Sequence, residues 1–128
     1  MNRIVLDASA LLALLNGEPG ADKLTVELLN RATSSTVNLA EVQAKLVARG
    51  IAPEDAWEAA QSGIREAIDF TAAHARITGN LVTQTRSLGL SLGDRACLAL
   101  GLALNAPVYT ADQSWRNLKL GIRIHVIR

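Results

Sequence analysis

The sequence predicts an α/β domain of three layers, in which a central parallel sheet of about five strands lies between two layers of helices. Short apolar or β-branched runs alternate with helical patterns along the whole chain, and such alternation produces parallel strands with helices on both faces. No internal repeat, low-complexity run or linker divides the 128 residues, a length typical of one domain. We therefore expect a single domain over residues 1–128.

The first strand is predicted at Ile4–Leu6, an apolar run typical of a strand that is buried on both faces. Asp7 follows it directly, and Ser9 is a suitable cap for a helix over Ala10–Leu15. The order strand, acid, helix places Asp7 at the carboxyl edge of the sheet, where open α/β sheets bind their ligands.

The next predicted elements are an amphipathic helix over Ala21–Ala32, with leucines on one stripe and charges opposite, and a β-branched strand over Thr33–Val37. A second long helix opens at Asn38 and ends at Gly50. This segment therefore repeats the order helix, strand, helix.

A helix is predicted to start at Pro53, which two acids follow, and to run to about Ala67. Ala67–Phe70 is a candidate third strand. Thr71 is expected to cap a long helix that reaches Leu88. The almost wholly apolar helix over Ala96–Leu104 must then be central to the core.

Two strands are predicted near the end of the sequence. Val108–Thr110 is a short buried strand, and Gln113–Leu118 forms one or two helical turns after it. Ile122–Ile127 alternates apolar with polar residues, as on a strand at the edge of a sheet.

Composition narrows the function classes. The net charge is +1, so a polyanionic partner would be met by local basic patches. Aromatic residues make up 3%, which argues against base-stacking platforms. Cys97 is the sole cysteine, which excludes an intramolecular disulfide and a thiolate metal site, and its apolar surroundings predict a core residue. Without a membrane-spanning run or a secretory pattern, we expect a cytoplasmic protein with no membrane partner.

Four acids share one kind of position, at the end of a predicted strand or in the first turn of the helix after it: Asp7, Glu41, Asp94 and Asp112. We expect them to converge at the carboxyl edge of the sheet. Two carboxylates ~4 Å apart repel by about 4 kcal/mol at an effective dielectric near 20, so a cation must hold them together. Oxygen ligands without thiolate favour Mg²⁺ or Mn²⁺, and such ions suit phosphodiester hydrolysis.

Each acid also has a structural alternative. Glu41 lies three residues after Asn38, which fits a capping pattern. Asp94 gains from the helix dipole, and Asp112 can cap the turn that follows it. Asp7 has the least local use, because it comes directly after a fully apolar strand. The four positions together favour a site.

The segments around these acids resemble the four signature blocks of PIN-domain nucleases. The blocks are Asp7-Ala8-Ser9-Ala10-Leu11, Asn38-Leu39-Ala40-Glu41-Val42, Leu92-Gly93-Asp94-Arg95-Ala96-Cys97-Leu98-Ala99 and Thr110-Ala111-Asp112-Gln113-Ser114-Trp115. Their order, their spacing and the total length are similar to those of the VapC toxins of bacterial toxin–antitoxin pairs. The resemblance spans nearly the whole chain.

The resemblance implies a PIN-like fold and an endoribonuclease that depends on Mg²⁺ or Mn²⁺. It also implies an RNA substrate, a homodimer, and a cognate antitoxin that holds the enzyme inactive. On the family pattern, Asp7 and Asp94 would be the principal metal ligands. Glu41 and Asp112 would complete the acidic pocket, partly through metal-bound water.

Three neighbouring residues complete this interpretation. Ser9 and Thr110 would hold carboxylates or water by hydrogen bonds. Arg95 departs from the family pattern, since many relatives have alanine after the third acid. It could pair with Asp94 or contact RNA phosphate, and the sequence leaves both open.

Other classes fit less well. A signalling receiver needs an acidic pair after the first strand and a phosphoacceptor after the third, but only Asp7 follows the first, and Asp69 does not end an apolar strand. A haloacid-dehalogenase phosphatase needs an aspartate where Ser9 stands. The third alternative is a catalytically silent PIN scaffold, against which the presence of all four acids speaks.

The remaining polar residues have weaker functional interpretations. His74 and His125 belong to no spacing typical of a triad or zinc site. Several basic residues are candidate phosphate contacts, with a solvated surface as the alternative: Lys45, Arg49, Arg86, Arg95, Arg116 and Lys119.

Overall fold

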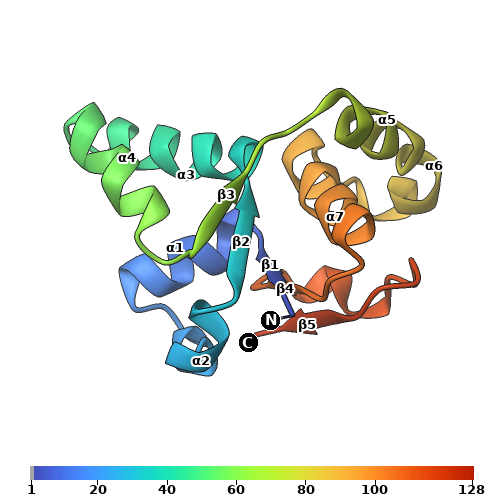
Figure 1. Ribbon diagram of the computed structural model, residues 1–128, viewed down its shortest axis with the longest axis horizontal. Helices are drawn as coiled ribbons and strands as arrows, with labels where there is room; N and C mark the ends of the chain where they lie inside the picture. The colour runs from blue at the N-terminus through green and yellow to red at the C-terminus, as the bar shows by residue number, and fades with distance from the viewer. Residues whose placement is uncertain (1) are drawn as a thin grey trace.

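The sheet of the computed structural model, which describes residues 2–128, has five strands. They are β1 Ile4–Leu6, β2 Ala32–Ser35, β3 Glu66–Ile68, β4 Val108–Thr110 and β5 Ile124–Val126. All neighbouring strands are parallel, in the order β3-β2-β1-β4-β5, so β1 is central (Figure 1). The predicted parallel sheet of five strands and the predicted edge position of the last strand are confirmed.

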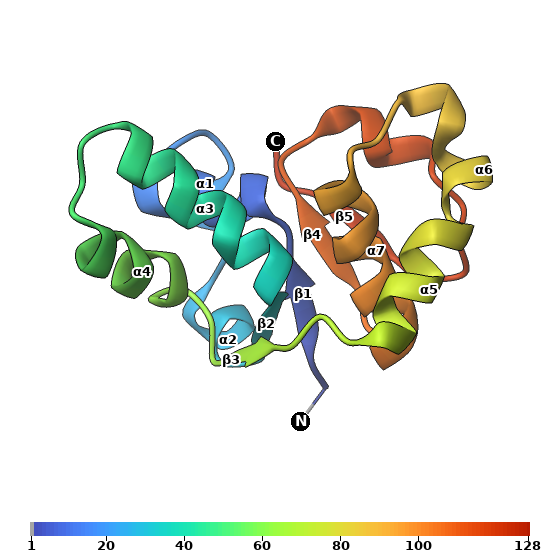
Figure 2. The ribbon, with the colours of Figure 1, turned by 90° about the horizontal axis from the view of Figure 1, so that it is seen from above.

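Six of the helices form two layers, one on each side of the sheet (Figures 1 and 2). One layer contains α1 Ala8–Asn16, α3 Thr36–Ala48 and α4 Pro53–Gln61, and the other contains α5 Ala72–Asn80, α6 Val82–Thr85 and α7 Leu92–Leu104. The short elements are α2 Val26–Leu29 and the 3-10 turns η1 Ala21–Lys23, η2 Arg86–Leu88 and η3 Gln113–Asn117. The three-layer α/β/α prediction is confirmed.

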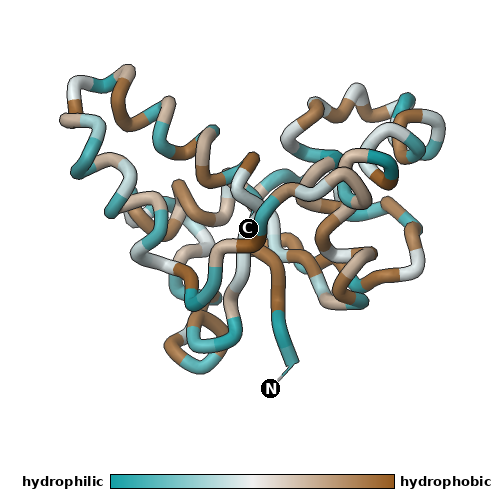
Figure 3. Tube along the Cα trace, turned by 45° about the horizontal axis from the view of Figure 1, so that its top comes forward, coloured by the Kyte–Doolittle hydropathy of each residue, from teal (hydrophilic) through white to brown (hydrophobic). Residues whose placement is uncertain are grey.

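β1 is buried on both faces because its side chains alternate between two hydrophobic cores. Ile4 and Leu6 belong to the core beneath α1, α3 and α4. Val5 packs on the other face with Cys97 and its apolar neighbours in α7. Figure 3 shows the trace turning from hydrophilic to hydrophobic soon after the N-terminus, as the chain enters β1. The expectations for the first strand, for the apolar helix and for Cys97 as a core residue are confirmed.

The predicted helix over residues 21–32 was wrong. The chain makes the turn η1 and then restarts as the four-residue α2, and Ala32 already belongs to β2. Thr25 causes the restart, since its backbone is extended and its hydroxyl oxygen accepts the N–H of Leu28 at 3.3 Å. A threonine that caps in this way competes with a continuous helix.

The predicted helix over residues 71–88 is interrupted. Thr71 caps it as expected, but α5 ends at Asn80, and α6 and η2 follow as separate short pieces. The hydroxyls of Thr78 and Thr85 donate to the carbonyl oxygens four residues earlier, at 2.7 and 2.8 Å. Such bonds bend helices.

Several boundaries also differ from the expected ones. The helix that starts at Pro53 ends at Gln61 rather than at residue 67. The strands expected at 33–37, 67–70 and 122–127 are present as β2, β3 and β5, whose ends differ from the expected ones by a few residues.

Among residues 2–128, none of the helices has both the length and the apolar character needed to cross a lipid bilayer.

Candidate acidic site at the carboxyl edge of the sheet

Asp7 is buried at the end of β1, with 3% of its surface exposed. It is the N-cap of α1, because its Oδ1 accepts the N–H of Ala10 at 2.8 Å. The helix begins at Ala8, so Ser9 lies inside it and is not the cap that we expected. The expectation that Asp7 has little local use was therefore also wrong.

Two hydroxyl groups hold the Asp7 carboxylate. Ser9 donates from Oγ to Oδ1 at 2.8 Å, and Thr110 donates from Oγ1 to Oδ2 at 2.6 Å. Both hydroxyl oxygens also accept backbone N–H groups, Ser9 from Ala111 at 2.9 Å and Thr110 from Asp112 at 3.0 Å. These bonds connect the end of β1 with the segment after β4.

Burial changes the protonation of Asp7. It raises the pKa of this carboxyl from 3.8 to about 6, although the hydrogen bonds from Thr110, Ala10 and Ser9 lower it, and the charge of Asp94 raises it further. At pH 7 the group is therefore mostly ionised. A buried anion next to a second carboxylate favours a positive charge nearby.

Glu41 is positioned by Asn38, a residue that sequence reasoning treated only as a cap. The cap of α3 is Ser35, and Asn38 lies inside the helix. Its Nδ2 donates to Glu41 Oε1 at 2.8 Å and to the carbonyl oxygen of Gly93 at 3.0 Å. The signal in the sequence is a polar residue on the otherwise apolar face of the helix, three positions before an acid.

Gly93 lies against the same carboxylate. A Cβ placed on Gly93 would collide with the carboxyl group of Glu41. The glycine at the start of α7 therefore leaves room for the acid that α3 presents. Figure 2 shows α3 and α7 on either side of β1.

Asp94 and Asp112 both make capping contacts, Asp94 in the first turn of α7 and Asp112 directly before η3. Ser91 and Asp94 form a capping box, with the N–H of Ser91 donated to Asp94 Oδ2 at 3.1 Å. Asp112 Oδ1 accepts the backbone N–H and the hydroxyl of Ser114, at 2.9 and 2.7 Å. The capping contacts considered as a structural alternative are thus present at Asp7, Asp94 and Asp112. Each of these carboxylates still has lone pairs that are available to another group.

The charges of three of the acids act on one residue of α7. The pKa of the fully buried Cys97 thiol is raised, first by burial and then by the charges of Asp7, Asp94 and Glu41. Asp112 is linked to this group through Thr110. Within residues 2–128, however, no three Asp, Glu, His or Cys side chains lie close enough together to hold one metal ion.

Arg95 does not pair with Asp94, and its contact with RNA phosphate stays a prediction. It donates from Nη1 to the carbonyl oxygen of Thr78 at 3.0 Å and so ties α7 to α5. The only ion pairs between described residues are Arg3–Glu66 and Arg128–Glu18, and neither includes one of the four acids. The other candidate phosphate contacts are exposed: Lys45, Arg49, Arg86, Arg116 and Lys119.

The donors at this edge suit a hard divalent cation. They are carboxylate and amide oxygens, and Asn38 Oδ1 is buried with no hydrogen-bond partner among the described residues. Mg²⁺ commonly takes only one or two protein carboxylates and keeps waters and substrate oxygens as its other ligands. Asp7 and Asp94, whose charges interact, are the two carboxylates here that could supply such ligands.

Comparison with known proteins identifies the family of this fold. The family model for the PIN domain matches residues 4–120. The chain belongs to the PIN domain family. No curated protein is matched by sequence.

Solved structures with the same PIN fold cover nearly all of the chain. VapBC2 from Rickettsia felis, bound to a promoter DNA fragment, is 21% identical with a TM-score of 0.74 and covers 98% of both chains. DNA-bound VapBC from Salmonella typhimurium is 18% identical with a TM-score of 0.74 and covers 100% of both chains. VapC20 from Mycobacterium tuberculosis, a toxin that cleaves the sarcin-ricin loop, is 20% identical with a TM-score of 0.71, over 94% of this chain and 98% of that one.

Proposed function

We propose that this chain is an endoribonuclease that depends on Mg²⁺ or Mn²⁺ and acts as a single PIN domain over residues 1–128. The observation that carries the proposal is the buried carboxylate of Asp7, held by two hydroxyls and next to the charge of Asp94 at the carboxyl edge of the sheet. A group with a pKa of about 6 is ionised at pH 7 and available to a cation.

In this proposal Asp7 and Asp94 are the principal metal ligands, and Glu41 and Asp112 complete the acidic pocket. A bound divalent ion supplies an activated water and stabilises the leaving oxygen of a phosphodiester. The chain's own contribution is orientation, since Thr110 fixes the Asp7 carboxylate at 2.6 Å. Ser9 does the same from the first turn of α1.

We extend the proposal to a toxin that a cognate antitoxin neutralises. Several solved structures of the same fold are toxin–antitoxin complexes, including those from Rickettsia felis and Klebsiella pneumoniae. VapC20 is a toxin that cleaves the sarcin-ricin loop. The proposed partners are an RNA substrate, an antitoxin chain and a second copy of this chain, in the cytoplasm.

A silent PIN scaffold is the second candidate, favoured by one observation. Asp7, Asp94 and Asp112 all cap helical elements, so stabilising the fold would be sufficient reason for their presence. The two candidates differ in one measurable property, the affinity of the folded chain for a divalent cation.

The deciding experiment measures thermal unfolding with MnCl₂, against a monovalent salt of equal ionic strength, in the native chain and in Asp94→Asn. An ion at 100 times its dissociation constant stabilises a fold by about 2.7 kcal/mol. We expect a Mn²⁺-dependent rise in Tm that shrinks in Asp94→Asn. Asparagine keeps an oxygen for the Ser91 N–H, so we expect the Tm without metal to stay the same or rise.

Cleavage of total bacterial RNA is the second measurement. We expect Mn²⁺-dependent cleavage by the native chain and none by Asp94→Asn. No Tm shift in the native chain would contradict the nuclease and favour the scaffold. A Mn²⁺-dependent shift in Tm without cleavage of total RNA would support the metal site and contradict a nuclease of broad RNA specificity.

A further inference from the structure

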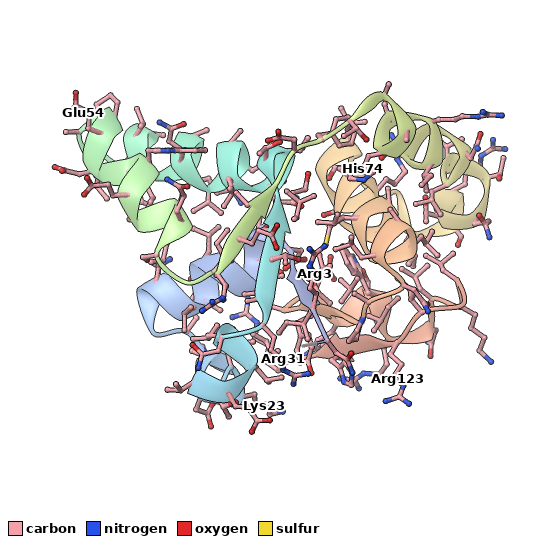
Figure 4. All side chains as sticks on the ribbon, in the orientation of Figure 1. Arg3, Lys23, Arg31, Glu54, His74 and Arg123 are labelled. Atoms are coloured by element: carbon pink, nitrogen blue, oxygen red, sulfur yellow. The ribbon has the colours of Figure 1, made fainter. Side chains whose placement is uncertain are left out.

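A polar cavity opens at the amino edge of the sheet, opposite the acids. Its volume is about 540 Å³, and it is lined by the beginnings of β1, β4 and β5 and by residues just before them. The described residues that line it include Arg3, Arg31, Arg123 and His125 and no acidic side chain. Figure 4 shows Arg31 and Arg123 at the lower end of the sheet, away from the starts of α3 and α7.

The arginines of this cavity are only partly satisfied within the chain. Arg3 forms an ion pair with Glu66 at 3.5 Å, in which both side chains are about half exposed. Arg31 donates from Nη1 to the carbonyl oxygen of Asn2 at a long 3.4 Å, and its Nε is buried with no acceptor among the described residues. Arg123 is exposed and belongs to neither of the two ion pairs. Guanidinium groups with N–H donors that have no acceptor within the chain are suited to bind phosphate oxygens.

An aromatic pair lies beside these guanidinium groups. Tyr109 in β4 and His125 in β5 are register partners, and their rings are stacked with centroids 4.5 Å apart and planes 19° apart. Burial and the charge of Arg123 lower the pKa of His125, so its ring is mostly neutral at pH 7. The low aromatic content argued against a base-stacking platform, yet Tyr109, the sole tyrosine of the chain, stacks on His125 at this cavity.

We propose that this cavity binds a nucleoside monophosphate unit, with the phosphate on Arg31 and Arg123 and the base against the Tyr109–His125 ring pair. The unit is either a free nucleotide or one nucleotide of a single-stranded RNA. Stacking on aromatic rings and contacts between cationic side chains and phosphate are the two components of such binding. From Arg3 to Asp7 the chain extends by about 13 Å, so this site is separate from the acidic one and does not depend on it.

Isothermal titration calorimetry with 5′-AMP at pH 7.5 in EDTA tests the proposal, since EDTA silences any metal at the acidic site. We expect AMP to bind more tightly than adenosine, ribose 5-phosphate or inorganic phosphate. Arg31→Gln and Arg123→Gln should each weaken AMP binding about tenfold or more, because each removes a charge-assisted hydrogen bond. His125→Ala should abolish the preference for AMP over ribose 5-phosphate.

Arg116→Gln is the matched control, since Arg116 is exposed in η3 and does not line the cavity. We expect it to bind AMP as the native chain does. Arg123 is also exposed, so Arg123→Gln keeps the test valid even if Arg31→Gln fails to fold. No AMP binding by the native chain, or equal affinity in Arg123→Gln and the native chain, would overturn the proposal.

A competition experiment separates the two sources of the ligand. A 2′-O-methyl tetraadenylate without a terminal phosphate resists cleavage and serves as the RNA probe. If it displaces AMP, the unit belongs to an RNA strand, and if it does not, the ligand is a free nucleotide. Asp94→Asn should bind AMP normally, so failure of the proposed nuclease leaves this result interpretable.

Discussion

Thr110 Oγ1 donates to Asp7 Oδ2 at 2.6 Å, although 103 positions separate the two residues in the sequence. The parallel register of β1 and β4, in which Leu6 pairs with Tyr109, brings the two side chains together. A hydroxyl that donates to a carboxylate stabilises its ionised form, so Thr110 lowers the pKa of Asp7 against the effect of burial. Among the hydrogen bonds to Asp7, the one from this hydroxyl does most to favour the ionised carboxylate.

The first prediction concerns Thr110→Val, which keeps the shape of the side chain and removes the donor. We expect the pKa of Asp7 to rise above about 6, which moves the acidic limb of the pH–rate profile for RNA cleavage to higher pH. The free energy of unfolding should fall by about 1 kcal/mol, because the N–H of Asp112 also loses its acceptor. An acidic limb at the same pH as in the native chain would contradict this role.

The control for that substitution is Thr83→Val. Thr83 is exposed and makes only a weak 3.5 Å bond to the carbonyl oxygen of Asn80. Its replacement should leave both the pH–rate profile and the free energy of unfolding within experimental error.

The second prediction concerns stability and pH. Because burial raises the pKa of Asp7 from 3.8 to about 6, the folded chain binds this proton more tightly than the unfolded chain. The free energy of unfolding should therefore fall as pH rises from about 4 to 6. At about 1.4 kcal/mol per pKa unit, the loss approaches about 3 kcal/mol above pH 6.

Asp7→Asn cannot ionise and should escape this loss. In EDTA we expect it to exceed the native chain in stability at pH 8 by about 1–3 kcal/mol, and to lose this advantage at pH 4. Urea unfolding at both pH values measures the difference. RNA cleavage by the variant should be abolished. If the difference in free energy of unfolding between Asp7→Asn and the native chain is the same at pH 4 and pH 8, the raised pKa of Asp7 is wrong.

The sequence was sufficient for the strands and for their parallel arrangement. Ile4–Leu6 and Val108–Thr110 were placed correctly because an apolar run between polar turns has few other uses in an α/β domain. The helix over residues 21–32 failed because the capping bond of Thr25 is local chemistry that the leucine stripe conceals. The hydrophobic period signals which face is buried, and it does not reveal where a hydroxyl interrupts the backbone ladder.

The acidic site could be predicted only in part. That Asp7 lies at the carboxyl edge follows from its place after a strand, and this required no knowledge of the packing. The contact between Asn38 and Gly93 spans 55 positions and exists because α3 and α7 pack against each other. Such a tertiary contact leaves no periodic signal in a single sequence.

The third prediction separates stability from function at Gly93. Alanine in place of a helical glycine ordinarily adds about 0.5–1 kcal/mol of stability. At Gly93 the three atoms nearest to the new Cβ all belong to the Glu41 carboxyl group, so alanine displaces this carboxylate from its bond with Asn38. The loss of that bond offsets the ordinary gain, and we expect the free energy of unfolding to change by less than about 1 kcal/mol. The Mn²⁺-induced shift in Tm should shrink, and RNA cleavage should slow about tenfold or more.

Gly79→Ala provides the matched control in α5. A Cβ there would meet no atom within 4 Å, so the free energy of unfolding should rise by the ordinary amount of about 0.5–1 kcal/mol. The Mn²⁺-induced shift in Tm and the cleavage rate should stay unchanged. Equal cleavage rates in the two variants would show that Glu41 has no role.

The last prediction concerns Asn38→Asp, which has the same shape but replaces a donor by an acceptor. The new carboxylate would face two acceptors, Glu41 Oε1 and the carbonyl oxygen of Gly93, in a position that is 1% exposed. We expect a loss of about 2 kcal/mol or more at pH 7, which lessens toward pH 4 as the acid is protonated. Asn38→Ala should lose about 1–2 kcal/mol without this pH dependence. Urea unfolding of both variants from pH 4 to pH 7 measures these losses. If the free energy of unfolding depends on pH in the same way in both variants, Asn38 acts by its volume alone and its N–H donors have no role.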